Sequence, residues 1–94
     1  MIFNLGAKNN FTDGVKLDLY PNPVSSFVNL NLQLQDNKPY GLFLYDFDGT
    51  LKFTKEGFGS LSEQLSLFDF DAGWYTFVVD TGDERISKRF LIDK

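Results

Sequence analysis

The sequence contains no histidine and no cysteine. Without them the chain cannot form Cys and His zinc sites, the usual haem and iron–sulfur ligation, thiol nucleophiles or Ser-His-Asp triads. The missing cysteines leave the redox compartment open, because cytosolic and secreted proteins alike can fold without disulfides. We therefore expect none of these metal sites, cofactors or catalytic groups.

Long hydrophobic runs and a leader segment are also missing. The apolar runs are far shorter than the roughly 20 residues that span a bilayer, so we expect no membrane span. Residues 1–5 have neither a basic stretch nor a long apolar stretch, so no signal peptide is expected. If the protein is exported, we expect this chain to be one piece of a longer protein.

Basic residues are in the minority. Nine Lys and Arg stand against thirteen Asp and Glu, which gives a formal net charge of −4. This balance argues against nucleic acid and anionic membrane surfaces as main partners. The chain has 94 residues, of which 43% are hydrophobic and 17% aromatic, enough for one small domain with a packed core.

Alternation of apolar and polar residues runs through most of the sequence and predicts β-strands. It is clearest over residues 28–35, where Val and Leu alternate with Asn and Gln. Residues 40–45 are instead apolar on both faces, as in a central strand that is covered on both sides. No long stretch has helical periodicity with caps. The expected strands are residues 15–20, 28–35, 40–45, 51–55, 61–67, 73–81 and 84–92.

Turn-forming residues separate these strands at short, regular intervals. Asp48-Gly49 predicts a two-residue hairpin of type I′, and Thr81-Gly82-Asp83 predicts another hairpin. Seven short strands with such turns favour an all-β fold, a small immunoglobulin-like antiparallel β-sandwich. We assign residues 15–94 to this domain and interpret residues 1–14 as a linker remnant or an edge segment laid against it.

One hairpin carries a motif that could belong to an enzyme. The string Asp46-Phe47-Asp48-Gly49-Thr50-Leu51 follows an apolar strand and resembles the nucleophile motif of haloacid-dehalogenase-type phosphatases. That chemistry uses a parallel sheet built from βαβ units, and the sequence has no helical segment to form one. The same residues are typical of a hairpin tip in which Asp46 caps the strand end, and we prefer that interpretation.

Two other groups of side chains could bind ligands. The carboxylates of Asp46, Asp48, Asp69 and Asp71 could hold Ca²⁺ if their loops met at one end of the sandwich. Their spacing does not match an EF-hand, and solvated loop carboxylates are the simpler interpretation. An aromatic platform for sugar rings could be formed by Trp74, Tyr75, Tyr45 and Tyr20. Neighbouring residues of a strand face opposite ways, however, so only one of Trp74 and Tyr75 can point into the core.

Basic residues gather near residue 94 of this acidic chain, at Arg85, Lys88, Arg89 and Lys94. A solvated strand face is one explanation. The other is a recognition strip, in which an exposed strand and its positive charge contact the edge or an acidic groove of a partner.

Four segments together resemble the C-terminal sorting domains of the type IX (Por) secretion system. They are residues 19–24 with the string Tyr-Pro-Asn-Pro, residues 44–51, residues 72–79 and residues 87–92. Their order and spacing fit that family over residues 15–94.

The resemblance implies a targeting function and not chemistry, in exported proteins of Bacteroidota-type bacteria. We therefore expect no catalytic residue, no bound metal and no cofactor. Such a domain is attached to a cargo protein that reaches the periplasm by a signal peptide of its own. The outer-membrane type IX translocon then moves the cargo to the cell surface or the extracellular medium, and a sortase-like peptidase removes the domain. The alternative is a carbohydrate-binding or adhesion module of a surface enzyme.

On this interpretation, two groups of residues carry the function. The first secures the fold: Pro21, Asn22 and Pro23 form a rigid opening turn, Gly49 serves the hairpin, and Gly73 stands beside an inward-packing Tyr75. The second group, expected to contact the translocon, is Lys88, Arg89 and Lys94.

Overall fold

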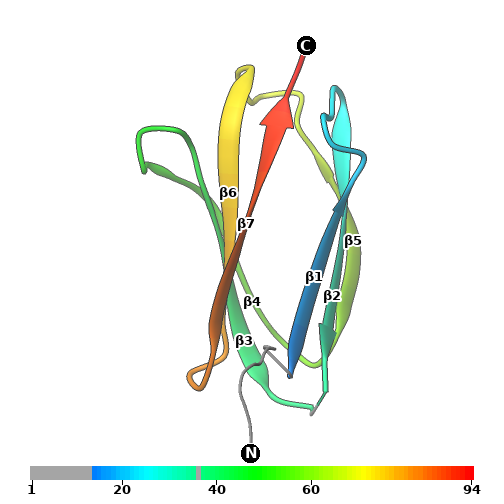
Figure 1. The fold of residues 1–94 in the computed structure, drawn as a ribbon, viewed down its shortest axis with the longest axis vertical. Helices are drawn as coiled ribbons and strands as arrows, with labels where there is room; N and C mark the ends of the chain where they lie inside the picture. The colour runs from blue at the N-terminus through cyan, green and yellow to red at the C-terminus, as the bar shows by residue number, and fades with distance from the viewer. Residues whose placement is uncertain (1–13, 36) are drawn as a thin grey trace, which may run out of the picture.

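The computed structural model describes residues 14–35 and 37–94, which form seven β-strands in two sheets. The strands are β1 (Val15–Tyr20), β2 (Phe27–Leu34), β3 (Pro39–Tyr45), β4 (Leu51–Phe58), β5 (Leu61–Ser66), β6 (Gly73–Asp80) and β7 (Arg85–Ile92). One sheet has the order β1-β2-β5 and the other the order β4-β3-β6-β7, with antiparallel pairing throughout. The two sheets face each other (Figure 1), which confirms the predicted all-β sandwich.

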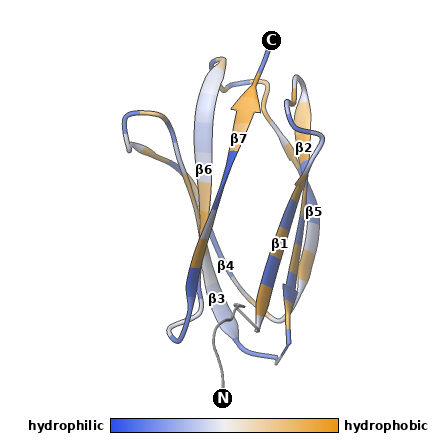
Figure 2. Cartoon of the chain, in the orientation of Figure 1, coloured by the Kyte–Doolittle hydropathy of each residue, from blue (hydrophilic) through white to orange (hydrophobic). Residues whose placement is uncertain are grey.

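The period-two pattern decides which side chains form the core. Along β2, Val28, Leu30, Leu32 and Leu34 are buried between the sheets, and the Asn and Gln residues between them face outward. Figure 2 shows this alternation as successive orange and blue bands along β1. The largest fully buried side chains come from both sheets and from Leu67, just after β5; they are Phe77, Phe90, Leu32, Leu42, Leu44, Leu67 and Ile92.

The outer face of β3 is open, so the expectation that residues 40–45 are covered on both sides is wrong. Leu42 and Leu44 point into the core, whereas Phe43 and Tyr45 lie half-buried on the outer face with their ring centroids 6.5 Å apart. Val78 of β6 lies opposite Phe43 on that face and is buried beside it. The apolar residues of this face shield one another, which explains how a strand can be apolar on both sides without a third layer.

The β3–β4 hairpin is wider than the two-residue type I′ turn that Asp48-Gly49 predicted. The N–H of Gly49 donates to the carbonyl of Asp46 at 3.0 Å, and the N–H of Asp46 donates to the carbonyl of Thr50 at 3.0 Å. Gly49 has a φ of 87°, which glycine adopts without steric cost. Asp46 caps the strand as expected, since its Oδ1 accepts from the N–H groups of Asp48 and Thr50, each at 2.9 Å.

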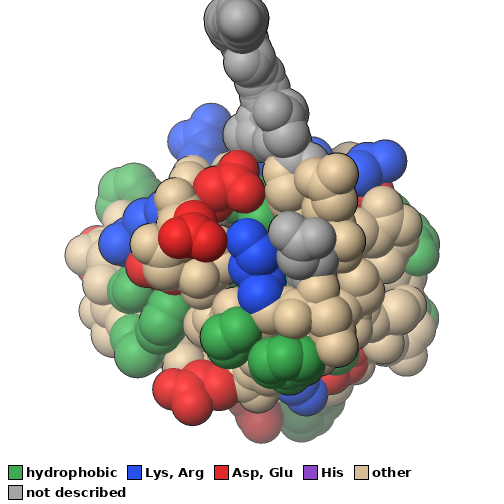
Figure 3. Space-filling view, turned by 90° about the horizontal axis from the view of Figure 1, so that it is seen from below, with side chains coloured by type: hydrophobic (Ala, Val, Ile, Leu, Met, Phe, Trp, Pro, Cys, Tyr) green, Lys and Arg blue, Asp and Glu red, His purple; other side chains and the backbone are tan. Residues whose placement is uncertain are grey.

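The predicted hairpin at Thr81-Gly82-Asp83 is confirmed. It joins β6 to β7, and the N–H of Thr81 donates to the carbonyl of Glu84 at 2.9 Å. Figure 3 views the end of the sandwich that holds this hairpin and shows acidic and basic side chains next to one another. Lys38 Nζ lies 3.5 Å from a carboxylate oxygen of Asp83. Among the residues described here, no helix is long and apolar enough to cross a membrane.

Two lysines join the sheets along the open sides of the sandwich. On one side, Lys88 of β7 donates from Nζ to the carbonyl of Leu17 in β1 at 3.1 Å. On the other side, Lys55 Nζ of β4 lies 2.8 Å from Glu63 Oε1 of β5. The hydrogen bond to Glu63 and its negative charge raise the pKa of the Lys55 ammonium. Each pair of facing edge strands is therefore linked by a lysine as well as by the core.

Truncating the core should cost far more stability than truncating an exposed ring of the same type. Phe77 is 0% exposed, and its ring centroid lies 5.4 Å from that of Phe90. We predict that Phe77→Ala lowers the free energy of unfolding by about 3–5 kcal/mol. Phe68 is 85% exposed, so Phe68→Ala should change it by less than about 0.5 kcal/mol. Urea unfolding followed by Trp74 fluorescence measures both, and similar losses in the two variants would contradict the assigned core.

Candidate functional site

The opening loop, residues 21–26 between β1 and β2, lies along the last strand. Asn22 Oδ1 accepts a hydrogen bond from the N–H of Leu91 at 3.1 Å. Val24 donates its N–H to the carbonyl of Leu91 at 2.9 Å and accepts from the N–H of Asp93 at 2.7 Å. These bonds form a short parallel bridge between Val24 and Ile92. The first and the last of the four sequence segments are therefore in direct contact.

The residues around Asn22 hold this loop in place. Pro21 and Pro23 flank Asn22, and both peptide bonds that precede them are cis. Each pyrrolidine ring fixes the φ of its residue, which limits the conformations open to the loop. Val24 is only 2% exposed and anchors the loop in the core. The structure thus places Pro21, Asn22 and Pro23 at the exposed edge of β7.

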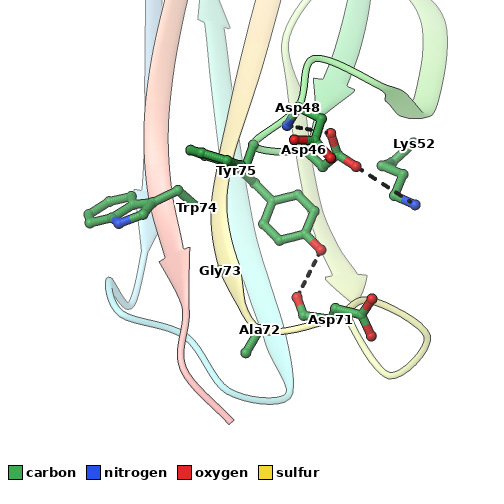
Figure 4. A pocket seen from close by; sticks show the side chains of 9 residues that line it. Asp46, Asp48, Lys52, Asp71, Ala72, Gly73, Trp74 and Tyr75 are labelled. Atoms are coloured by element: carbon green, nitrogen blue, oxygen red, sulfur yellow. Dashed lines mark hydrogen bonds and ion pairs between the residues drawn. The ribbon is translucent and has the colours of Figure 1, made fainter.

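Tyr75 points inward, as the sequence predicted. Its side chain is 4% exposed, its ring centroid lies 5.9 Å from that of Phe90, and its hydroxyl donates to the carbonyl of Asp71 at 2.8 Å (Figure 4). Burial raises the pKa of the Tyr75 hydroxyl, and the negative charge of Asp71 adds to the effect. Gly73 begins β6 with a φ of 143°, a conformation that side-chain-bearing residues rarely adopt.

The structure does not bring Lys88, Arg89 and Lys94 together. Lys88 faces the neighbouring sheet and bonds to the carbonyl of Leu17. Arg89 faces outward, with its guanidinium carbon 4.7 Å from the centroid of the Trp74 ring. Lys94 Nζ donates to the carbonyls of Phe68 and Phe70 in the loop before β6. Of these three residues, Arg89 is the one that makes no hydrogen bond or ion pair with another described side chain or carbonyl.

The acidic loops do meet at one end of the sandwich, but their carboxylates do not form a metal site. Asp46, Asp48 and Asp71 line a shallow groove with Lys52 and Tyr75 (Figure 4). Asp46 already accepts two main-chain hydrogen bonds, and its Oδ2 lies 4.0 Å from Lys52 Nζ. No three acidic side chains of residues 14–35 and 37–94 are placed to hold a metal ion. Asp46 acts as a turn cap, so the described geometry also gives no support to a phosphatase nucleophile.

The four aromatic residues considered as a sugar platform lie on different surfaces. Trp74 is 43% exposed and lies on the outer face of the four-stranded sheet, on the same side as Tyr45. Tyr75 is buried in the core, and Tyr20 is exposed on the three-stranded sheet. Strand alternation separates Trp74 from Tyr75, as expected. A platform of all four rings is therefore not formed.

Sequence reasoning missed the contacts that join distant segments. The bond between Asn22 and Leu91 spans 69 residues, and the bond between Lys88 and Leu17 spans 71. No local sequence pattern predicts either contact. The inward direction of Lys88 could have been predicted from the sequence, because Lys88 and Arg89 are neighbours on one strand and must face opposite ways.

A family model described as "Secretion system C-terminal sorting domain" matches residues 18–93, which include all four segments described above. No curated protein matches the chain.

Loss of the Asn22 side chain should loosen the opening loop from β7. We predict that Asn22→Ala lowers the free energy of unfolding by about 1 kcal/mol, the usual value of one hydrogen bond. Exchange of the Leu91 amide hydrogen should accelerate, since that N–H loses its partner. Asn31→Ala, on the outer face of β2, serves as the matched control. Equal Leu91 exchange rates in the two variants would show that the Asn22 contact does not hold the loop.

The fold should lose stability in alkali. A raised pKa means that Tyr75 binds its proton more tightly in the folded than in the unfolded protein, so the free energy of unfolding falls as the pH rises above the ordinary tyrosine value of 10.0. Lys55 acts in the same direction above 10.5. We predict that Tyr75→Phe shows a shallower decline in stability than the unsubstituted chain. Urea titrations across this pH range test it, and parallel curves would refute the role of Tyr75.

Proposed function

Because this chain belongs to the family of type IX secretion system C-terminal sorting domains, we propose that residues 15–94 form the signal that directs an attached cargo protein across the outer membrane. The family match over residues 18–93 is the observation that carries this proposal. The family is a sorting domain and not a catalytic one. The structure supports a signal that is read as a folded surface, since the described strands enclose one continuous core.

The proposed route has three stages. The cargo first enters the periplasm by a separate signal peptide. The outer-membrane translocon then recognises the folded sandwich and moves the cargo outward. A sortase-like peptidase finally removes the sandwich, and the cargo stays on the cell surface or enters the medium.

We divide the proposed site residues by what they do in the sandwich. Pro21, Asn22 and Pro23 hold the opening loop on β7, while Gly49, Gly73 and Tyr75 secure turns and core; these six residues preserve the shape of the signal. Lys88, Arg89 and Lys94 are proposed to contact the translocon. Among these three we place the first contact on Arg89, because the amino groups of Lys88 and Lys94 already bond to main-chain carbonyls.

One observation favours the alternative, a carbohydrate-binding or adhesion module. Trp74 is 43% exposed on the outer face of the four-stranded sheet, where the ring of a sugar could stack on it. Because Trp74 is the one tryptophan of the chain, titration with polysaccharides reports directly on this face. A saturable fluorescence change with a neutral polysaccharide would favour the alternative.

The sorting role predicts export that depends on the translocon. A periplasmic fluorescent protein joined to the complete chain should reach the cell surface or medium of a bacterium that has the type IX machinery. The same fusion should stay in the periplasm of a strain that lacks the translocon. A fusion carrying Phe77→Ala tests whether the folded core is needed and should also be retained. Equal surface signal with and without the translocon would overturn the proposed function.

A further inference from the structure

The last strand presents main-chain groups along a free sheet edge. β7 is the outermost strand of the four-stranded sheet and lies beside β1 of the other sheet (Figure 1). In antiparallel pairing, alternate residues direct both their N–H and C=O groups away from the neighbouring strand. The bonds of Leu91 to Asn22 and Val24 show that Leu91 is such a residue. Arg89, Ser87 and Arg85 share its direction, because each lies an even number of residues away in an unbroken register with β6.

The opening loop covers only one end of this edge. Asn22 and Val24 occupy the outward groups of Leu91, and the bridge ends at Ile92 and Asp93. No main-chain hydrogen bond joins the outward groups of Ser87 or Arg89 to another described residue. The available edge is therefore a defined segment, residues 85–89, bounded on one side by the opening loop and on the other by the β6–β7 hairpin.

The side chains along this segment carry positive charge on one face. Arg85, Ser87 and Arg89 lie on the outer face of the sheet, opposite Asp80, Val78 and Thr76 respectively. The Arg85 guanidinium is 4.0 Å from Asp80, and both side chains are well exposed, so the pair is weak. Arg89 makes no ion pair with a described residue. An acidic chain with a net charge of −4 thus places two arginines beside its free main-chain groups.

We propose that residues 85–89 accept an extended segment of a partner protein, which adds to the four-stranded sheet beside β7 and carries acidic residues opposite Arg85 and Arg89. Main-chain hydrogen bonds to Ser87 and Arg89 give the affinity. The acidic side chains give the specificity, because residues directly opposite on adjacent strands have Cβ atoms about 4.5–5.5 Å apart. The opening loop stops the added strand before Leu91. This inference rests on the proposed function in one respect, since we place the acidic strand in the export machinery.

The competing explanation is protective. Charged residues on an edge strand also prevent unwanted pairing between sheets. On that explanation the two arginines repel strands in general and no acidic segment binds. A binding measurement with a peptide of defined sequence separates the two explanations.

Peptide binding tests the edge without the secretion machinery. The probe is the blocked peptide Thr-Glu-Val-Thr-Val-Glu-Thr, with a Gln-for-Glu version as its control. Titrated into the complete chain, the acidic peptide should shift the amide signals of Ser87 and Arg89 and change the fluorescence of Trp74, which lies against Arg89. The Gln peptide should bind about fivefold more weakly, from the loss of two opposite-charge pairs. Equal affinities, or no binding of either peptide, would overturn the proposal.

Two variants separate the main-chain groups from the charges. Ser87→Pro removes an outward N–H that the β6–β7 ladder does not use, a position where edge strands tolerate proline, and should weaken peptide binding about tenfold. Ser87→Ala keeps that N–H and should bind as the unsubstituted chain does. Arg85→Gln with Arg89→Gln should reduce acidic-peptide affinity to that of the Gln peptide, whereas Lys16→Gln with Lys52→Gln should not. If thermal unfolding shows that Ser87→Pro does not fold, the arginine variant decides alone.

The reporter fusion distinguishes failure of this inference from failure of the proposed function. The proposal predicts that the folded Ser87→Pro and double-arginine fusions are retained in the periplasm while the Ser87→Ala fusion is exported. If all of these fusions are exported like the unsubstituted one, the edge inference is wrong and the sorting role stands. If the unsubstituted fusion itself is not exported by the translocon, the sorting role is wrong, whatever the peptides show.

Discussion

The contact between the opening loop and the last strand closes one side of the sandwich and sets how much of the β7 edge stays open. Two packed sheets bury their inner faces but leave two open sides, and here the chain closes one of them with its own first and last segments. Val24 enters the core and pairs with Ile92, while Asn22 bonds to Leu91 from the edge. Lys88 extends this closure down the same side to Leu17. Without that closure, β7 would form main-chain hydrogen bonds only with β6, and its buried side chains Phe90 and Ile92 alone would hold it against the other sheet.

The strands could be predicted from the sequence, because a buried face and an exposed face alternate at period two along most of them. The prediction for β3 was wrong in one respect. An apolar run has the same sequence pattern whether another layer covers its outer face or neighbouring apolar side chains shield one another there, as Phe43 and Tyr45 do. The turn after β3 was predicted too short, because Asp46 uses both its main chain and its carboxylate to extend the loop. The alternation of apolar and polar residues predicts where the strands lie in the sequence. It does not predict which distant strand edge a loop will contact.

In the candidate site, too, the directions of side chains within a strand could be predicted, and the contacts between distant segments could not. Strand alternation allowed only one of Trp74 and Tyr75 to point inward, and the family resemblance assigned that direction to Tyr75, which is buried. The three basic residues read as one strip lie in three environments, because Lys88 and Arg89 face opposite sides of β7 and Lys94 turns back to the loop before β6. Of the basic side chains of β7, the two on the outer face, Arg85 and Arg89, bond to no main-chain carbonyl of the described residues, whereas Lys88 does. The Tyr-Pro-Asn-Pro segment covers one end of the final strand and leaves the edge of residues 85–89 open.

The central claim is that the export machinery reads the folded sandwich at β7. The most direct measurement places a photo-reactive side chain at position 87 of the reporter fusion and, in a second fusion, at position 31 on the outer face of the other sheet. Both fusions are illuminated during export in cells that have the type IX translocon. The account predicts a covalent adduct with an outer-membrane component of that machinery from position 87 and none from position 31. Adducts of equal yield from both positions, or export without any adduct from position 87, would contradict it.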